Sequence, residues 1–190
     1  MIDTVLLDRD GVINFDSAFY IKSPEEWKPI PGSLEAVALI GRDGKKGRRK
    51  VGVVTNQRGM ALGLYDADTL AAIHEKMRAA LAGAGGRIDA LAFCPHDTFE
   101  DCECRKPRPG MLLSLLEQFA TNPDHALMVG DKYSDIEAAR AAGVRPVLVL
   151  TGQGRETLHL RQRDLGDTPV YADLAAVALA LQTGTLGALP

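Results

Sequence analysis

Short apolar runs alternate with stretches of helical spacing along this 190-residue chain. The apolar runs predict strands at residues 2–7, 50–55, 88–93, 125–129 and 145–150. The intervening periodicity predicts helices at residues 31–40, 66–82, 109–119, 134–142 and 172–181. The helix at 66–82 has the clearest pattern, because Leu70, Ile73, Met77 and Leu81 recur at helical spacing.

This alternation predicts an α/β fold: a three-layer, Rossmann-like, mostly parallel sheet with helices on both faces. We expect one domain over residues 1–190, because the length suits one compact unit. No insert is long enough for a large cap domain, and residues 152–154 offer a possible flap. Ligands of such sheets bind beyond the carboxyl ends of the strands, so the candidate chemistry is sought there.

Composition changes this picture little. Hydrophobic residues make up 46% and charged residues 25%, and the formal net charge is −3. These values give no general attraction to nucleic acid or to an anionic membrane. The basic run at 41–50 suits a solvated loop better than a nucleic-acid patch. With neither a secretory signal nor an apolar segment long enough to cross a bilayer, we expect a cytoplasmic monomer without nucleic-acid or membrane partners.

Polar residues follow the first predicted strand as Asp8-Arg9-Asp10-Gly11. Two carboxylates two residues apart can converge on one metal ion and one reacting phosphorus. One could attack as a nucleophile, and the other could act as general acid and base. Asp-x-Asp also occurs in solvated turns, so this pattern alone leaves both interpretations open.

Three further strand ends or loops carry candidate groups. Thr55 and Asn56 could hydrogen-bond phosphate oxygens or cap a turn. Asp131 could join the first two aspartates around Mg²⁺, which prefers oxygen ligands. Asp135 could hold a metal-bound water or favour a helix N-terminus. Lys106 could neutralise a phosphate, although a lone lysine is usually solvated.

A second cluster lies between the third strand and Lys106. Its four candidate ligands are Cys94, His96, Cys102 and Cys104. Three thiolates and one imidazole fit a closed tetrahedral zinc site, which would be structural because it leaves no open position. The alternative is three unrelated buried thiols, which the C-x-H and C-x-C pairing makes less favourable.

The order of these motifs resembles the haloacid dehalogenase-like phosphatases. The matching pieces are Asp8-Arg9-Asp10-Gly11-Val12-Ile13-Asn14, Val54-Thr55-Asn56-Gln57, Cys104-Arg105-Lys106-Pro107 and Gly130-Asp131-Lys132. The resemblance covers residues 2–152. It implies that Asp8 is the nucleophile, Asp10 the general acid and base, and Asp131, Asp8 and the Asp10 carbonyl the Mg²⁺ ligands. It further implies that Thr55 and Lys106 hold the transferring phosphoryl group. Asn56, Arg105 and Lys132 are further candidates for phosphate or substrate binding.

The cysteine loop narrows the resemblance to the branch that acts on heptose bisphosphates and histidinol phosphate. Residues 20–27, 30–32, 56–61 and 104–111 are more similar to the heptose enzymes. That branch usually has Ala-Arg-Gly where Ala61-Leu62-Gly63 stands here. Arg58 is a candidate to replace the missing arginine, and Arg105, Arg108 and Arg58 are candidates for a second phosphate site.

The expected function is Mg²⁺-dependent hydrolysis of a phosphorylated sugar through an aspartyl-phosphate intermediate, with the 7-phosphate of a manno-heptose bisphosphate as the leading substrate. One alternative substrate is histidinol phosphate or another small phosphate ester. A different class, a non-catalytic zinc-stabilised binding protein, would not need the complete set of Asp8, Asp10, Lys106 and Asp131.

Overall fold

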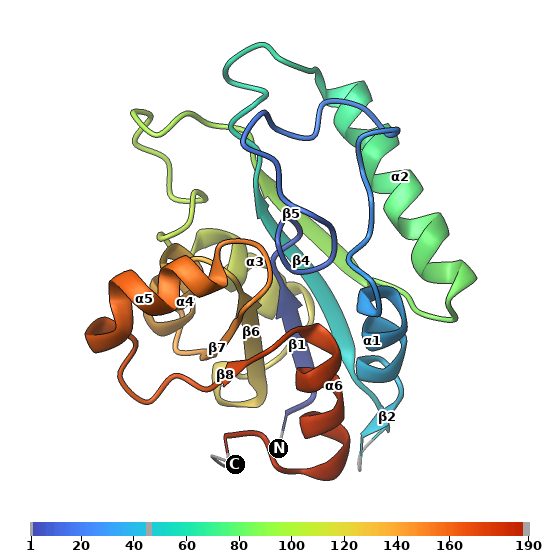
Figure 1. The fold of residues 1–190 in the computed structure, drawn as a ribbon, viewed down its shortest axis with the longest axis vertical. Helices are drawn as coiled ribbons and strands as arrows, with labels where there is room; N and C mark the ends of the chain where they lie inside the picture. The colour runs from blue at the N-terminus through green and yellow to red at the C-terminus, as the bar shows by residue number, and fades with distance from the viewer. Residues whose placement is uncertain (1, 45–46, 188–190) are drawn as a thin grey trace.

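One parallel sheet organises the computed structural model, which describes residues 2–44 and 47–187. Its six strands run in the order β5-β4-β1-β6-β7-β8 (Figure 1). The strands are β1 (Thr4–Leu7), β4 (Lys50–Asn56), β5 (Ala90–Cys94), β6 (Ala126–Gly130), β7 (Arg145–Val149) and β8 (Val170–Tyr171). The predicted parallel α/β sheet is therefore confirmed.

Helices cover both faces of this sheet. They are α1 (Ser33–Ile40), α2 (Ala67–Gly83), α3 (Gly110–Gln118), α4 (Tyr133–Ala141), α5 (Gly154–Leu165) and α6 (Leu174–Thr183). Val5 and Leu7 of β1 pack into one core cluster with α1, α2 and α6. Leu6 points the other way, into a second cluster with α3 and α4. Because successive strand side chains alternate between faces, both faces of the central strand need apolar cover.

Several boundaries differ from the sequence-based prediction. The first helix begins at Ser33 rather than at residue 31, because Gly32 before it has a φ of 80°. Helix α5 and strand β8 were not predicted, nor was the antiparallel pair β2 (Asp43–Gly44) and β3 (Gly47–Arg48). A 3₁₀ turn, Pro123–His125, precedes β6. Of the possible flap at 152–154, Gly152 and Gln153 are exposed and Gly154 is buried at the start of α5, so the flap stays a prediction.

The basic run at 41–50 is not uniformly solvated as expected. The Arg49 side chain is buried, and its guanidinium donates to the carbonyl oxygens of Ile2, Ile40 and Leu181. It therefore joins the ends of α1 and α6 to the segment that enters β1. Lys45 and Lys46 lie outside the described residues.

Two long loops cover the carboxyl ends of the strands. One connects β1 to α1, and the other connects β5 to α3 (Figure 1). Trp27 of the first loop is only 1% exposed, so it packs beneath the loop instead of closing over a ligand. Within 2–44 and 47–187, no helix combines the length and the apolar character needed to cross a membrane.

Candidate active site

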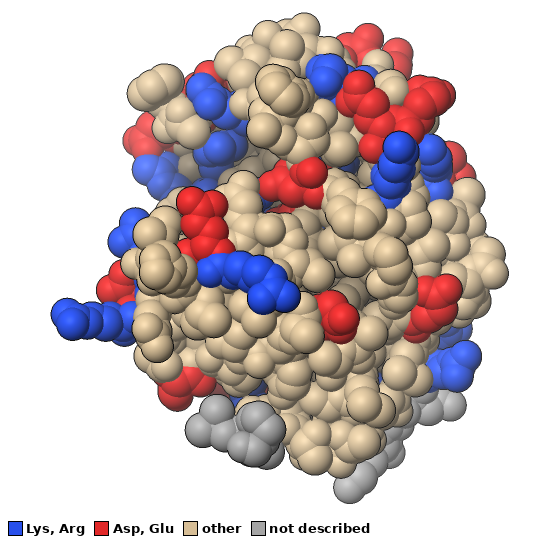
Figure 2. Space-filling view, in the orientation of Figure 1, with Lys and Arg blue, Asp and Glu red and all other residues tan. Residues whose placement is uncertain are grey.

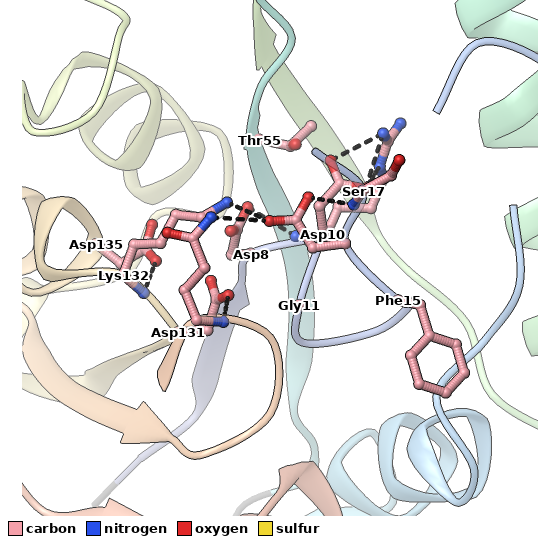
Figure 3. A network of polar contacts seen from close by, with 12 residues as sticks. Asp8, Asp10, Gly11, Phe15, Ser17, Thr55, Asp131, Lys132 and Asp135 are labelled. Carbon is pink, nitrogen blue, oxygen red and sulfur yellow. Dashed lines mark hydrogen bonds and ion pairs between the residues drawn. The ribbon is translucent and has the colours of Figure 1, made fainter. Parts of the chain in front are cut away.

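Three acidic residues meet where the two central strands end. In the sheet register Leu7 pairs with Val129, so Asp8 after β1 and Asp131 after β6 emerge side by side. Asp135 in the first turn of α4 joins them, and a carboxylate oxygen from each of the three lies within 4.8 Å of the others. All three side chains are buried, and Figure 3 shows them converging. This is the arrangement that the strand-end rule predicts.

Glycine backbone makes this close approach possible. A Cβ atom on Gly11 would lie 2.1 Å from Oδ2 of Asp131, and a Cβ on Gly152 would lie at the same 2.1 Å. A Cβ on Gly130 would lie 2.2 Å from Cβ of Asp135. No side chain fits at these three positions, so they form the floor on which the carboxylates rest.

Lys106 supplies the cation for this acidic group. Its Nζ lies 2.8 Å from Oδ1 of Asp8 and 2.7 Å from Oδ1 of Asp135. The ammonium also donates to the Val54 carbonyl oxygen at 2.8 Å. Burial alone would lower the pKa of Lys106, but the two carboxylates outweigh it and raise the pKa. The alternative of a solvated lysine is excluded, because Lys106 is only 4% exposed.

Asp135 has a second role in the backbone. Its Oδ2 accepts a hydrogen bond from the backbone N–H of Lys132 at 3.0 Å, next to the start of α4. The helix-terminus interpretation of Asp135 is therefore correct. The same carboxyl group also belongs to the acidic cluster, so the two interpretations of this residue are compatible.

The acidic cluster carries more negative charge than Lys106 balances. Burial raises the pKa of Asp8 to about 6, with Asp135 adding to the effect and Lys106 opposing it. Burial likewise raises the pKa of Asp131 to about 8, against the attraction of Lys132. Oδ2 of Asp131 accepts from the Gln153 backbone N–H at 2.8 Å. Its buried Oδ1 has no hydrogen-bond partner among the described residues.

Asp10 lies in a different environment. Its carboxylate accepts from the Arg9 guanidinium at 2.9 Å, from Asn14 at 2.8 Å and from Gln57 at 3.1 Å. Burial would raise the pKa of Asp10, but the Arg9 charge and these hydrogen bonds outweigh it and lower the pKa. The pKa values of the two carboxyl groups of the Asp-x-Asp motif are therefore shifted in opposite directions.

Gln57 connects several of these groups and was missed by the sequence analysis as a site residue. Its amide donates to Oγ1 of Thr55 at 2.7 Å, and its carbonyl oxygen accepts from the Tyr65 hydroxyl at 2.7 Å. Arg9, Asn14 and Tyr65 were missed too. Arg9, Asn14 and Gln57 lie within the matched sequence motifs, and this position was the signal that could have identified them. Tyr65 lies outside the matched motifs.

An open cleft of about 760 Å³ leads to the carboxylates. The basic residues that line it include Arg58, Arg105, Arg108 and Lys132. Figure 2 shows Lys and Arg side chains gathered beside a hollow at the upper left of this face. Local groups can therefore attract an anionic ligand although the net charge is −3.

The remaining predicted ligands differ in their contacts. The Asn56 amide exchanges two hydrogen bonds of 3.1 Å with the backbone of Lys106, so it orients the lysine loop. Lys132 pairs with Asp16 at 2.9 Å across the cleft. Among the residues that the structure describes, Arg105 donates only to the His96 carbonyl oxygen, at 3.2 Å.

The four predicted zinc ligands lie together in the loop after β5. Sγ of Cys94 is 3.5 Å from Nδ1 of His96 and 3.7 Å from Sγ of Cys102. Nδ1 of His96 is 3.2 Å from Sγ of Cys104. The cluster immediately precedes Arg105 and Lys106, so its geometry fixes where the loop enters the cleft.

Comparison with known proteins agrees with this site. A family model described as HAD-hydrolase-like matches residues 103–177. The D-glycero-β-D-manno-heptose-1,7-bisphosphate 7-phosphatase of Pseudomonas putida is 46% identical over 178 residues, which cover 93% of this chain and 98% of that protein.

Solved structures give the same result. The D,D-heptose 1,7-bisphosphate phosphatase of Bordetella bronchiseptica, crystallised with magnesium and phosphate, superposes with a TM-score of 0.88 at 44% identity, covering 96% of this chain and 99% of that one. The Burkholderia thailandensis enzyme has a TM-score of 0.71 at 39% identity, over 95% and 99% of the two chains. The chain therefore belongs to the heptose-1,7-bisphosphate 7-phosphatase family of the HAD-like hydrolases.

Proposed function

We propose that this protein removes the 7-phosphate of D-glycero-β-D-manno-heptose 1,7-bisphosphate, with Asp8 as the nucleophile. One observation carries the proposal: Asp8 meets Asp131 and Lys106 at the inner end of the cleft, in a chain 46% identical to a phosphatase of that name. The β anomer is taken from the names of the relatives.

The first chemical step transfers the phosphoryl group to Asp8. Oδ1 of Asp8 already contacts Lys106 and accepts from the Arg9 backbone N–H at 2.8 Å. Oδ2 then forms the bond to phosphorus while the phosphorus–oxygen ester bond breaks. The leaving oxygen keeps the bonding electron pair and takes a proton from the Asp10 carboxyl group.

The second step regenerates the enzyme. The ionised Asp10 accepts a proton from water as the water oxygen attacks the phosphorus. The bond between phosphorus and Asp8 breaks, inorganic phosphate leaves, and Asp10 again carries a proton. Thr55 and Lys106 hold the phosphoryl oxygens during both transfers, where positioning and charge neutralisation provide most of the catalysis.

The residues present fit a Mg²⁺ ion. The buried Oδ1 of Asp131 has no hydrogen-bond partner among the described residues, and hard oxygen donors of this kind are what Mg²⁺ prefers. Asp8, Asp131 and the Asp10 carbonyl oxygen would hold the ion. When bound, Mg²⁺ neutralises charge on the carboxylates and on the phosphoryl oxygens.

Arg105 is our candidate for the second phosphate of the substrate. Arg58 is paired with Asp97 at 2.8 Å, and Arg108 contacts Asp101 and Glu103. Among the described residues Arg105 has no acidic partner, yet it lines the cleft. Its guanidinium is therefore available for a bidentate contact with phosphate oxygens. Lys132 and Asn56 stay candidates for contacts closer to the reacting phosphate.

We also propose a structural Zn²⁺ at Cys94, His96, Cys102 and Cys104. Tetrahedral zinc, with ligand distances of about 2.0 Å to nitrogen and about 2.3 Å to sulfur, separates its donor atoms by about 3.5–3.8 Å. The separations of 3.7 and 3.5 Å at Cys94 agree with this geometry. The ion would hold the loop that carries Arg105 and Lys106.

We propose that the enzyme works as a cytoplasmic monomer. Cysteine thiols such as those of the proposed zinc cluster persist in a reducing compartment. Sedimentation at assay concentrations tests the oligomeric state, and a dimer would refute this part.

The decisive experiment measures kcat/KM with Mg²⁺ for both anomers of the heptose 1,7-bisphosphate, for histidinol phosphate and for fructose 1,6-bisphosphate. We expect a preference of about 100-fold or more for the β-heptose compound, which corresponds to roughly 2.7 kcal/mol of transition-state discrimination. A flat profile, or a preference for histidinol phosphate, would refute the heptose assignment while leaving the aspartate chemistry intact.

A further inference from the structure

A buried guanidinium separates the two catalytic aspartates in the sequence. Arg9 lies between Asp8 and Asp10 and is only 1% exposed, which makes it one of the largest fully buried side chains. Burying an arginine is costly unless its charge and its donors are matched. The chemistry proposed above assigns no task to this side chain.

The Arg9 guanidinium donates hydrogen bonds to both oxygens of the Asp10 carboxylate. Nε donates to Oδ1 at 3.1 Å, while Nη2 donates to Oδ1 at 3.0 Å and to Oδ2 at 2.9 Å. A planar guanidinium that contacts both oxygens fixes the plane of the carboxylate as well as its position. Asn14 completes the set with a bond of 2.8 Å to Oδ1.

The Arg9 guanidinium also contacts helix α2 and the loop after β4. Nη1 lies 3.1 Å from Nε2 of His74, in the middle of α2. Nη2 also donates to Oε1 of Gln57 at 3.2 Å, just after β4. Because arginine has only donors, Nε2 of His74 must be the acceptor. The His74 ring is therefore neutral, in accord with its burial and with the Arg9 charge, which lower its pKa to about 3.

Helix α2 gives this contact a rigid base. Ile73 and Met77, on either side of His74 along the helix, belong to the main core cluster, and the His74 side chain is itself buried. The sequence by itself indicates no residue that His74 contacts. In the structure it links the core helix to the Asp-x-Asp loop, 65 residues away in the chain.

We propose that Arg9, anchored by the His74 imidazole and the Gln57 amide, is the positioning residue that orients the Asp10 carboxyl group for proton transfer to the leaving oxygen. The inference rests on the proposed phosphatase function and deepens it. Catalytic proton transfer depends on geometry within hydrogen-bond reach.

Leaving-group dependence tests this role apart from a purely structural one. An alkyl phosphate such as glycerol 3-phosphate needs its leaving oxygen protonated, whereas p-nitrophenyl phosphate releases a stable anion without that help. We expect Arg9→Met to lower kcat/KM for the alkyl ester by about 100-fold and for p-nitrophenyl phosphate by less than about fivefold. Equal losses on both esters would overturn the proposal.

Changes at His74 keep the test valid if Arg9→Met does not fold. His74→Phe removes the acceptor and should reduce alkyl-ester hydrolysis selectively, by about tenfold. His74→Gln restores an acceptor and should recover activity to within about threefold of the wild type. The matched control is Ile73→Val, which changes packing on the same helix and should leave the ratio between the two esters unaltered. Failure of the glutamine rescue would contradict the anchoring role.

The result of the Arg9 test can be distinguished from the result of the test of the substrate. Wild-type protein that hydrolyses both model esters but not the heptose bisphosphate refutes the substrate and leaves the Arg9 test intact. Protein that hydrolyses no ester at all with Mg²⁺ refutes both.

Discussion

The two sides of the catalytic cleft balance their charges differently. On the β4 side, Asp10 accepts hydrogen bonds from Arg9, Asn14 and Gln57, so the chain itself satisfies the carboxylate. On the β6 side, Lys106 pairs with Asp8 and Asp135, whereas the buried Oδ1 of Asp131 lacks a partner within the described ranges. The first side holds the Asp10 carboxyl group in place, and the second has room in its ligand set for a cation.

The comparison also explains the divergent acidities of the two aspartates. The pKa of Asp8 is raised to about 6 by burial and neighbouring carboxylates, whereas that of Asp10 is lowered by Arg9 and its hydrogen-bond donors in spite of burial. Asp8 must be ionised to attack phosphorus, and a cation bound beside it would lower its pKa towards that state. The difference in pKa originates in Arg9 within the motif and in the side chains packed around the two carboxyl groups.

The largest effect is expected where both sides meet. Asp8→Asn should lower kcat by about 10³-fold or more, because the amide cannot form the aspartyl-phosphate. The substitution is nearly isosteric, so the circular dichroism spectrum should stay that of the wild type. Retained turnover in a folded variant would remove Asp8 as the nucleophile.

A substitution on each side should change stability in opposite directions. Without Mg²⁺, Asp131→Asn removes a carboxyl group that must take up a proton on burial at neutral pH, and it should raise the free energy of unfolding by about 1 kcal/mol. Asn14→Ala removes a donor from a satisfied carboxylate and should lower it by about 1–3 kcal/mol. Urea denaturation of the metal-free proteins measures both values. Changes of the same sign would break the comparison.

Added Mg²⁺ should change the melting temperatures of variants on the two sides of the cleft by different amounts. We expect Mg²⁺ to raise the melting temperature of the wild type and of Asn14→Ala, because binding to the folded state stabilises it. Asp131→Asn should lose most of this increase, since it removes a proposed ligand. An undiminished increase in that variant would place the ion elsewhere.

The zinc cluster offers an effect on stability of similar size, away from the carboxylates. Cys102→Ser should lower the free energy of unfolding by about 2 kcal/mol, or the melting temperature by about 4–8 °C. Phe99→Ser in the same loop is the matched control, because Phe99 is 91% exposed and belongs to no ligand set. Metal analysis of the purified protein should find about one zinc per chain. Protein without zinc would leave the four residues as an ordinary thiol cluster.

The smallest effect concerns the arginines that border the cleft. Arg105→Ala should raise KM for the bisphosphate about tenfold, while Arg58→Ala should change it less than about twofold, since Arg58 is already paired with Asp97. A monophosphate substrate should abolish the difference. Equal effects of the two substitutions would contradict Arg105 as the ligand of the second phosphate.

The sequence predicted what depends on local pattern. Alternating apolar runs and helical periodicity identified the five longer strands and five of the six helices, and the strand-end rule brought Asp8 and Asp131 together. Helix α5 lacks an apolar stripe: of its residues only Gly154, Thr157 and Leu165 are buried, and the backbone is kinked at Arg161. Periodicity cannot detect such a helix, nor a strand as short as the two-residue β8.

Contacts between distant segments were not predictable in the same way. Nothing in the spacing of Arg9, Gln57 and His74 indicates that they touch, because the contacts depend on how α2 packs against the sheet. His74 on an apolar helix face and the buried Arg9 guanidinium indicate a positioning role only once their contact is known. The charged run at 41–50 misled for the same reason, since Arg49 finds its three carbonyl partners on separate elements.

The glycine floor beneath the carboxylates has a consequence for how such an enzyme can diversify. Because any Cβ at Gly11 or Gly152 would meet Asp131 at 2.1 Å, these positions tolerate almost no variation while the chemistry is kept. Arg58, Arg105 and Phe99, in contrast, line the cleft from loops with room to change. A library intended to retarget the phosphatase should therefore randomise the loop rim and leave the floor untouched, since new specificities are accessible only where the backbone can accept a new side chain.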